Sequence, residues 1–314
     1  MTVSSNVQRV QVSAAEAGRT LAAVVRGLMI GSSWNQAREL CTRGKVRVNG
    51  AVQTDAALRL SAGDEVEIQP NAPRVREHVL DETLLVHVDA QVVVVNKPAG
   101  LMSVPFEAGE KNTLVDRLRM LLRRKGGQQG AELGVVQRLD KDTTGVMVFA
   151  RTLAAKRHLQ QQFRVHSIER RYLALVHGQL EVADYDTLLI SDRGDGLRGS
   201  YGHFRRPRGA APPSAQRAVT HVRPLEALRG ASLVECRLET GRQHQIRIHL
   251  SEAGHPLLGE PVYIRDYQPP RIEAPRPMLH AETLGFTHPR TEQPVRFVMA
   301  PPEDFQQVLE RLRR

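Results

Sequence analysis

Residues 11–70 combine two hydrophobic periods that predict a small module of helices and short strands. Apolar residues recur at helical spacing within residues 14–29, and a second short helix is predicted for residues 34–43. The alternation at residues 45–48 predicts a strand, and Asn49-Gly50 is a strong signal for a tight hairpin turn. The pattern therefore predicts two helices followed by a hairpin and a further strand.

A larger domain is predicted for residues 81–314, after a short linker at residues 71–80. The segment 192–223 is rich in Gly, Pro and Arg, which predicts an irregular basic excursion rather than core. Apolar or alternating runs predict strands, and helical spacing predicts helices: the strands lie at residues 83–88, 92–95, 146–150, 172–176 and 233–238, and the helices at 153–163, at 303–314 and after Thr113.

The composition favours a nucleic acid as the partner. The 314 residues include 44 Lys and Arg against 34 Asp and Glu, which gives a formal net charge of +10 and a pI of about 10.2. This excess favours an anionic partner, although a basic surface that is only solvated would give the same numbers. The excess is rich in arginine, whose planar group suits phosphate contacts and base stacking.

The two cysteines and the hydropathy pattern indicate a cytoplasmic protein. Cys41 and Cys236 match no close metal-ligand spacing, so both are expected to be reduced structural thiols. No apolar run reaches the roughly 18 residues that a membrane helix needs, and the N-terminus lacks a signal pattern. We expect no membrane association, and we expect a monomer.

Four segments carry the candidate chemistry, and the first contains Asp140 in a turn beside Arg138. Asp, Thr and Gly also occur in ordinary loops that hydrogen-bond their own backbone, so this segment alone is ambiguous. The four segments are, in order, Gln137-Arg138-Leu139-Asp140-Lys141-Asp142-Thr143-Thr144-Gly145, Arg171-Tyr172-Leu173-Ala174-Leu175-Val176, Thr240-Gly241-Arg242-Gln243-His244-Gln245-Ile246-Arg247-Ile248-His249 and Leu279-His280-Ala281. Together they closely resemble the RluA-type RNA pseudouridine synthases.

The N-terminal module has a resemblance of its own. Gly44-Lys45-Val46-Arg47-Val48-Asn49-Gly50 and Ala62-Gly63-Asp64-Glu65-Val66 resemble a small RNA-binding module first known from a small-subunit ribosomal protein. The resemblance implies that Lys45 and Arg47 contact RNA. Trp34 stands where a basic residue is common, which removes one expected phosphate contact.

The family resemblance implies an α+β fold and an isomerase. The expected fold is the small RNA-binding module followed by a catalytic domain with a mixed, largely antiparallel bent sheet. The reaction breaks the bond between uracil and ribose, turns the base and rejoins it through carbon, so we expect neither metal nor cofactor. By resemblance Asp140 is the nucleophile, Tyr172 stacks on the flipped uracil, and Arg247 forms an ion pair with Asp140.

The resemblance also implies RNA contacts by Arg138, Arg171 and Arg242, and an apolar pocket residue at Leu284. This chain departs from the family's pattern at three positions: it has Gln137 where histidine is usual, Thr144 for serine, and Arg171 for lysine. Arg171 keeps the charge but replaces a compact ammonium with a planar fork. The essential carboxylate and glycine remain, so we expect activity.

The histidine-containing segment is predicted to be a strand. In a strand, Gln245, Arg247 and His249 share one face, while His244 and Ile246 lie on the other. The two histidines then face away from each other, and no third ligand has suitable spacing, so we expect no metal site.

Three other functions remain open from the sequence. A non-catalytic RNA-binding or ribosome-assembly factor would use the same charge and N-terminal module. A glycoside hydrolase also attacks an anomeric carbon with a carboxylate, but it needs a second acid that the motifs do not supply. Among isomerases, large-subunit ribosomal RNA is the favoured substrate, because relatives with this module commonly act there, and transfer RNA is the alternative.

Overall fold

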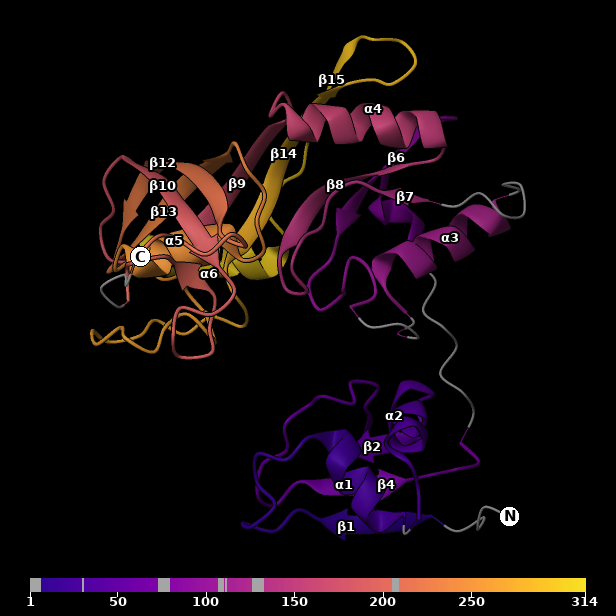
Figure 1. Ribbon diagram of the computed structural model, residues 1–314. Coiled ribbons are helices and arrows are strands. Elements are labelled where there is room, and N and C mark those ends of the chain that lie inside the picture. Colours follow the sequence, from indigo (N-terminus) through magenta and orange to yellow (C-terminus); the bar gives the residue numbers. More distant parts are fainter. Residues whose placement is uncertain are drawn as a thin grey trace. The chain divides into compact units, whose positions relative to one another are not determined.

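The computed structural model describes residues 7–29, 31–72, 80–106, 110, 112–125, 133–204 and 209–314, in two compact units, residues 1–78 and 79–314. Figure 1 shows the elements of each unit. The predicted linker at residues 71–80 falls mostly outside the described residues, as do Arg205, Arg206 and Arg208 of the predicted excursion. No helix in the described ranges is both long and apolar enough to span a bilayer.

The N-terminal unit is a small antiparallel sheet with two helices. Its strands run in the order β1-β4-β2-β3. Its elements are β1 (Gln8–Gln11), α1 (Leu21–Leu28), α2 (Trp34–Thr42), β2 (Val46–Val48), β3 (Ala51–Val52) and β4 (Glu65–Ile68). The strand β1 was not predicted. Buried apolar residues such as Leu21, Val25 and Ile68 form its own core, so this unit has a hydrophobic cluster separate from the larger one.

Local chemistry explains where the N-terminal elements begin. Ser33 caps α2, and its backbone N–H donates to Gln36, which completes a capping box. The first helix begins at Leu21, later than predicted, because Thr20 caps it and Gly18 has a φ of 84°. Asn49 and Gly50 both have positive φ, 51° and 77°, as the predicted hairpin turn requires.

Among its described residues, the C-terminal unit forms a mixed sheet of eleven strands, mostly antiparallel. Along its main path the order is β11-β10-β12-β13-β9-β14-β8-β6-β5, with β15 on β14 and β7 on β8. The strands are β5 (Leu85–Val88), β6 (Val92–Lys97), β7 (Gly134–Val135), β8 (Thr144–Ala150), β9 (Glu169–His177), β10 (Ala183–Ile190), β11 (Gly199–Ser200), β12 (Gln216–Leu228), β13 (Ala231–Leu238), β14 (Leu279–Thr287) and β15 (Pro294–Val298). The expected α+β fold is confirmed.

Helices cover the sheet in two halves. Figure 1 shows β6 and β8 with α3 and α4 in one half, β10, β12 and β13 with α5 and α6 in the other, and β9 and β14 between them. The helices are η1 (Glu82–Leu84, a 3-10 turn), α3 (Leu114–Arg124), α4 (Leu153–Arg164), α5 (Gln245–Glu252) and α6 (Glu303–Arg313). The strand β6 is buried on both faces, as predicted, with Val93 and Val95 in one cluster and Val92 and Val94 in another.

The predicted basic excursion is shorter than expected. The strand β12 already begins at Gln216, so Arg217 and Arg223 belong to the sheet, where they pair with Asp186 and Glu235. Glycine and proline are concentrated before this point, whereas the arginines continue past it. Arginine content was therefore a poor marker of irregular structure, because an exposed strand position accepts arginine when a carboxylate lies on the neighbouring strand.

Gly145 is required where β8 meets β14. The two strands pair in parallel there, with Gly145 opposite Ala281. Gly145 has a φ of 116°, and a Cβ atom at this position would lie 2.1 Å from the backbone oxygen of Ala281. Backbone cannot yield as a flexible side chain can, so only glycine allows β8 to follow the Asp140 loop at this distance from β14.

We predict that Gly145→Ala lowers the free energy of unfolding by roughly 2–4 kcal/mol, through overpacking and backbone strain together. Chemical denaturation measures the loss. Gly196→Ala is the matched control, because Gly196 has a φ of 81° with no atom near its missing Cβ. Equal losses in the two variants would show that strain alone acts at Gly145.

Candidate active site

Asp140 and Arg247 meet although they lie far apart in the chain. Asp140 is in the loop before β8, and Arg247 is in α5. The Arg247 Nη1 donates to Asp140 Oδ2 at 3.2 Å. On its other side, Arg247 donates from Nε and Nη2 to the two carboxylate oxygens of Glu260, at 2.8 and 2.6 Å. One guanidinium therefore links a buried acid to the acid predicted to be the nucleophile.

The two carboxylates differ in exposure. The Glu260 side chain is fully buried, whereas that of Asp140 is 28% exposed. Burial works against the charge of Arg247, but the hydrogen bonds and charge of Glu260 outweigh it, and the pKa of Arg247 is raised. Burial also opposes the charge of Glu260, yet Arg247 holds its pKa below the usual value. Both groups therefore stay charged at neutral pH.

His244 and Tyr263 complete the surroundings of Asp140. The His244 Nε2 lies 3.9 Å from Asp140 Oδ1, and its Nδ1 is 2.7 Å from the Tyr263 hydroxyl. Burial lowers the pKa of His244, with Asp140 opposing, so the ring is neutral at pH 7. The guanidinium of Arg247 lies over the Tyr263 ring, 5.3 Å from its centroid. These contacts fix the orientation of both basic groups.

The loop that carries Asp140 is held through its backbone carbonyls. The buried Lys97 donates to the carbonyls of Lys141 and Thr143, at 2.7 and 2.9 Å. On one side, Ser103 donates to the Leu139 carbonyl at 2.7 Å and accepts from the Leu139 N–H. On the other, Arg276 donates to the Asp142 carbonyl at 3.0 Å. The loop is thereby attached to two distant parts of the chain, residues 97–103 and Arg276.

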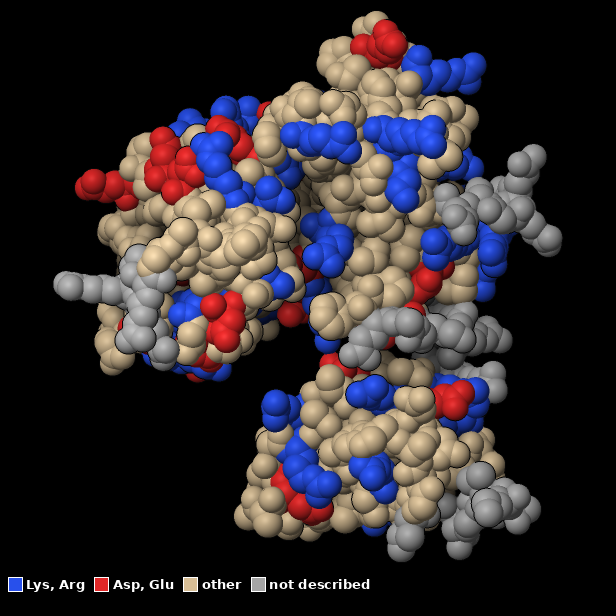
Figure 2. Space-filling model, viewed as in Figure 1, with Lys and Arg blue, Asp and Glu red and all other residues tan. Residues whose placement is uncertain are grey.

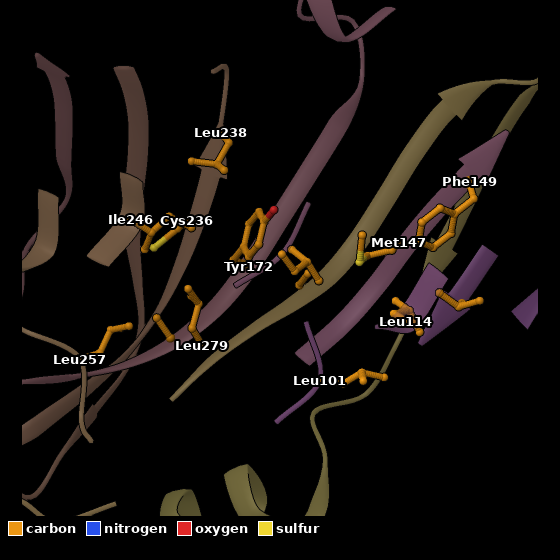
Figure 3. Close-up of a cluster of buried hydrophobic side chains, with 14 of the residues drawn as sticks. Leu101, Leu114, Met147, Phe149, Tyr172, Cys236, Leu238, Ile246, Leu257 and Leu279 are labelled. Carbon is orange, nitrogen blue, oxygen red and sulfur yellow. The ribbon is translucent and has the colours of Figure 1, made fainter. Parts of the chain in front are cut away.

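Tyr172 lies in β9 within the main hydrophobic cluster and is 8% exposed. Figure 3 shows its ring among side chains from β13, β14 and α5, including Leu238, Leu279 and Ile246. Burial raises the pKa of the phenol, while Arg170 acts to lower it and Asp140 to raise it further. The phenol is therefore protonated at neutral pH.

The predicted RNA-binding residues are spread over the two units. Arg138 is exposed beside Asp140, and Arg242 is exposed at the turn before α5, where it donates to the Arg217 carbonyl. Arg171 is ion-paired with Glu169 on its own strand and with Glu235 on the neighbouring strand β13. In the N-terminal unit, Lys45 is bonded to the Ala72 carbonyl and Arg47 to the Gly50 carbonyl. RNA contacts by all five stay predictions.

Leu284 does not pack in the cluster around Tyr172. It is 1% exposed and belongs to the cluster of α4, β6 and β8, with Val146 and Phe286. It is paired with Arg170, two residues before Tyr172 in β9. A contact of Leu284 with the base stays a prediction, whereas Leu238, Ile246 and Leu279 are the apolar neighbours of Tyr172.

The predicted strand at the histidine-containing segment is wrong, because Gln245–Glu252 is the helix α5. Residues 245–250 are all buried, so no polar face marks the helical period. Polar side chains are satisfied inside the protein instead: Gln245 donates to the Val219 carbonyl, and His249 bonds to Thr187 and Thr220. The alternating polar and apolar residues resembled those of a strand, but in the helix the predicted strand faces do not exist.

In the part of the chain that the structure describes, no group of three or more His, Cys, Asp or Glu is arranged to hold a metal ion.

Comparison with known proteins identifies the family. The model of the RNA pseudouridylate synthase family matches residues 91–252, which include Asp140, Tyr172 and Arg247. The chain belongs to this family. An S4 domain matches residues 19–66, so the enzyme has an N-terminal RNA-binding domain. It is an RNA pseudouridine synthase, an isomerase, as the sequence predicted.

Relatives match this pseudouridine synthase over most of its length. A protein of Zymomonas mobilis named ribosomal large subunit pseudouridine synthase D is 38% identical over 266 residues, 82% of each chain. A protein of Xanthomonas campestris with the same name is 34% identical over 99% of this chain and 94% of its own. The structure of human RNA pseudouridylate synthase domain containing 4 is 28% identical, with a TM-score of 0.60, over 76% of this chain and 97% of that one.

Sequence reasoning missed Glu260 and Lys97 in this pseudouridine synthase. Lys97 ends the apolar strand β6, next to Pro98. A lysine is seldom buried without partners, so its position in an apolar run indicates that buried acceptors bind its amine. Glu260 lies in a loop and outside the four motifs. Glu260 could be predicted only from the structure, because a buried Arg247 needs a carboxylate as its partner.

We predict that the stability of the wild-type enzyme rises relative to that of Lys97→Met between about pH 7 and about pH 10. Burial lowers the pKa of Lys97 from 10.5 to about 7, although Asp142 and Asp140 act to raise it. In this range the unfolded amine keeps a proton that the native amine has released, so raising the pH favours the native state. The gain is at most about 1.4 kcal/mol per pH unit.

Denaturation of both proteins across this range measures the difference. Below about pH 7 the amine is protonated in both states, so the two stability curves run parallel there. Parallel curves over the whole range would contradict the lowered pKa.

Proposed function

We propose that this enzyme converts uridine in large-subunit ribosomal RNA into pseudouridine, with Asp140 as the nucleophile. One observation carries the assignment of Asp140: it is a partly exposed carboxylate whose inner neighbour, Arg247, is fixed by the buried Glu260. The substrate is supported by relatives named ribosomal large subunit pseudouridine synthase D, at 34–38% identity. Transfer RNA is the competing substrate.

The target uridine reaches Asp140 only after it leaves the RNA stack. A base inside a helix hides the bond that must break, so enzymes of this kind extrude the nucleotide. Arg138 is exposed next to Asp140, where its guanidinium can hold a phosphate or take the place of the extruded base. Tyr172 then stacks on the uracil, with Leu238 and Leu279 behind it.

The reaction needs no net change of protons or electrons. The bond from ribose C1′ to uracil N1 breaks, a bond from C1′ to C5 forms, and the proton from C5 is replaced by one at N1. Arg247 holds the Asp140 carboxylate in position during bond breaking. The buried phenol of Tyr172 is the group near the base that carries a proton.

The site does not suit glycoside hydrolysis. That reaction uses a second carboxylate as acid or base on the other side of the bond. Glu260 is the second acid at Arg247, but it is fully buried, and both of its oxygens accept hydrogen bonds from Arg247. It can neither protonate a leaving group nor activate water. Release of free uracil from RNA would instead support hydrolysis.

We predict that Asp140→Asn retains RNA affinity and loses turnover by at least about 10³-fold, since the amide keeps the shape but not the nucleophile. Pseudouridine formed in purified large-subunit ribosomal RNA and in transfer RNA measures turnover and ranks the two substrates. Asp142→Asn makes the same charge change two residues away and keeps most of the turnover. If Asp140→Asn had the same turnover as the wild-type enzyme, Asp140 would not be the nucleophile, and a non-catalytic RNA-binding function would be favoured.

We predict that Arg247→Lys lowers kcat by about 10²-fold, because a lysine cannot span Glu260 and Asp140 in one fixed geometry. The salt dependence of RNA binding stays unchanged, since Arg247 is 7% exposed and faces acids. Arg138→Gln provides the contrast, with a salt slope reduced by roughly 0.7–0.9 if Arg138 contacts one phosphate. A reduced slope in Arg247→Lys would assign that residue to binding.

A further inference from the structure

The segment that connects the Asp140 loop to Tyr172 has an unusual charge. From Thr143 to Ile168 the sequence contains no Asp or Glu, but it contains Arg151, Lys156, Arg157 and Arg164. The last three lie on α4. The chain has 34 acidic residues, but α4 contains none of them. The positive charge of α4 is therefore not compensated within the helix.

Among the described residues, the cations of α4 lack the acidic partners that several other surface arginines have. Arg217 pairs with Asp186, Arg296 with Glu169, and Arg313 with Glu226. Within the described residues, no ion pair involves Lys156, Arg157 or Arg164. Arg164 donates to Gln161, at 3.2 Å. Their charges are therefore available to an external anion.

The face they occupy is exposed and polar. Figure 2 shows Lys and Arg side chains in a row over α4. The apolar side of the helix is already used, because Ala155 and Leu159 are buried against the sheet. Exposed apolar residues lie only near its ends, with Leu153 62% exposed and Val165 57% exposed. A membrane or an apolar protein groove would need a continuous apolar stripe, which this face does not offer.

The helix is also connected to the candidate site. Phe163, near its C-terminal end, lies under the guanidinium of Arg170, at 5.5 Å from the ring centroid. Arg170 is two residues before Tyr172 in β9 and acts on the pKa of its phenol. The buried side of α4 packs on the sheet face opposite to the cluster of Tyr172, so RNA reaches its exposed face only after it has passed this end of the sheet.

We propose that the exposed face of α4 is an RNA-binding surface that contacts phosphates of the substrate RNA outside the candidate site. The proposal rests on the proposed function for the nature of that RNA. Arg157 and Arg164 are separated by seven residues, about 10 Å along a helix axis, so they contact phosphates that are not adjacent. The exposed Gln160 and Gln161 between them can bond ribose hydroxyls.

The test is the double variant Arg157→Gln/Arg164→Gln, which removes two exposed charges and no ion pair. We expect the slope of log K against log salt for a stem-loop RNA to fall by roughly 1.4–1.8, from two lost phosphate contacts. KM for ribosomal RNA rises about tenfold while kcat stays unchanged, because the lost contacts are made equally in the ground and transition states. Arg157→Lys/Arg164→Lys keeps the charge and most of the slope.

The matched control is Arg229→Gln/Arg314→Gln, which removes two exposed charges elsewhere on the same unit. An unchanged slope in the α4 variant, or an equal fall in the control, would overturn the proposal. A thermal melt checks that the double variant is folded. If its Tm is lower than that of the wild-type enzyme, the single variant Arg157→Gln is used instead. RNA binding is measured apart from turnover, so a wild-type enzyme without activity on ribosomal RNA would reject the proposed function and still test α4.

Discussion

The bond between Arg247 and Glu260 is the interaction on which the site depends. A guanidinium buried in α5 is costly without a carboxylate, and Glu260 supplies both oxygens to it. The remaining nitrogen, Nη1, donates to Asp140. The pair is a poor source of stability, since desolvation offsets most of the attraction. Its effect is positional, because Asp140 meets a cation that cannot rotate away.

The rest of the fold brings this fixed cation and the Asp140 loop together. Strands β9 and β14 join the two halves of the sheet, so α5 from one half meets the loop from the other. The loop itself is held through carbonyls by Lys97, Ser103 and Arg276, which leaves the Asp140 side chain free for chemistry. At its end, Gly145 permits the close approach to β14. Backbone contacts thus set the position of the acid, and side-chain contacts set its charge environment.

The sequence predicted the fold class, the family and the meeting of Asp140 with Arg247, because short motifs carry those residues in order. It failed where a residue's partner is distant or buried. The helix α5 looked like a strand because burial on all sides removes the amphipathic period. Glu260 and Lys97 carry no local pattern that names their partners. Leu284 packs in a different cluster from Tyr172, since burial alone does not say on which side a residue packs.

The most direct test of the account is to map pseudouridine across all RNA in cells that lack this gene and carry either the wild-type protein or Asp140→Asn. The account predicts that a signal in large-subunit ribosomal RNA disappears without the gene, returns with the wild-type protein and stays absent with the variant. A signal restored by Asp140→Asn would contradict the role of the carboxylate. A change confined to transfer RNA would contradict the substrate while leaving the isomerase intact.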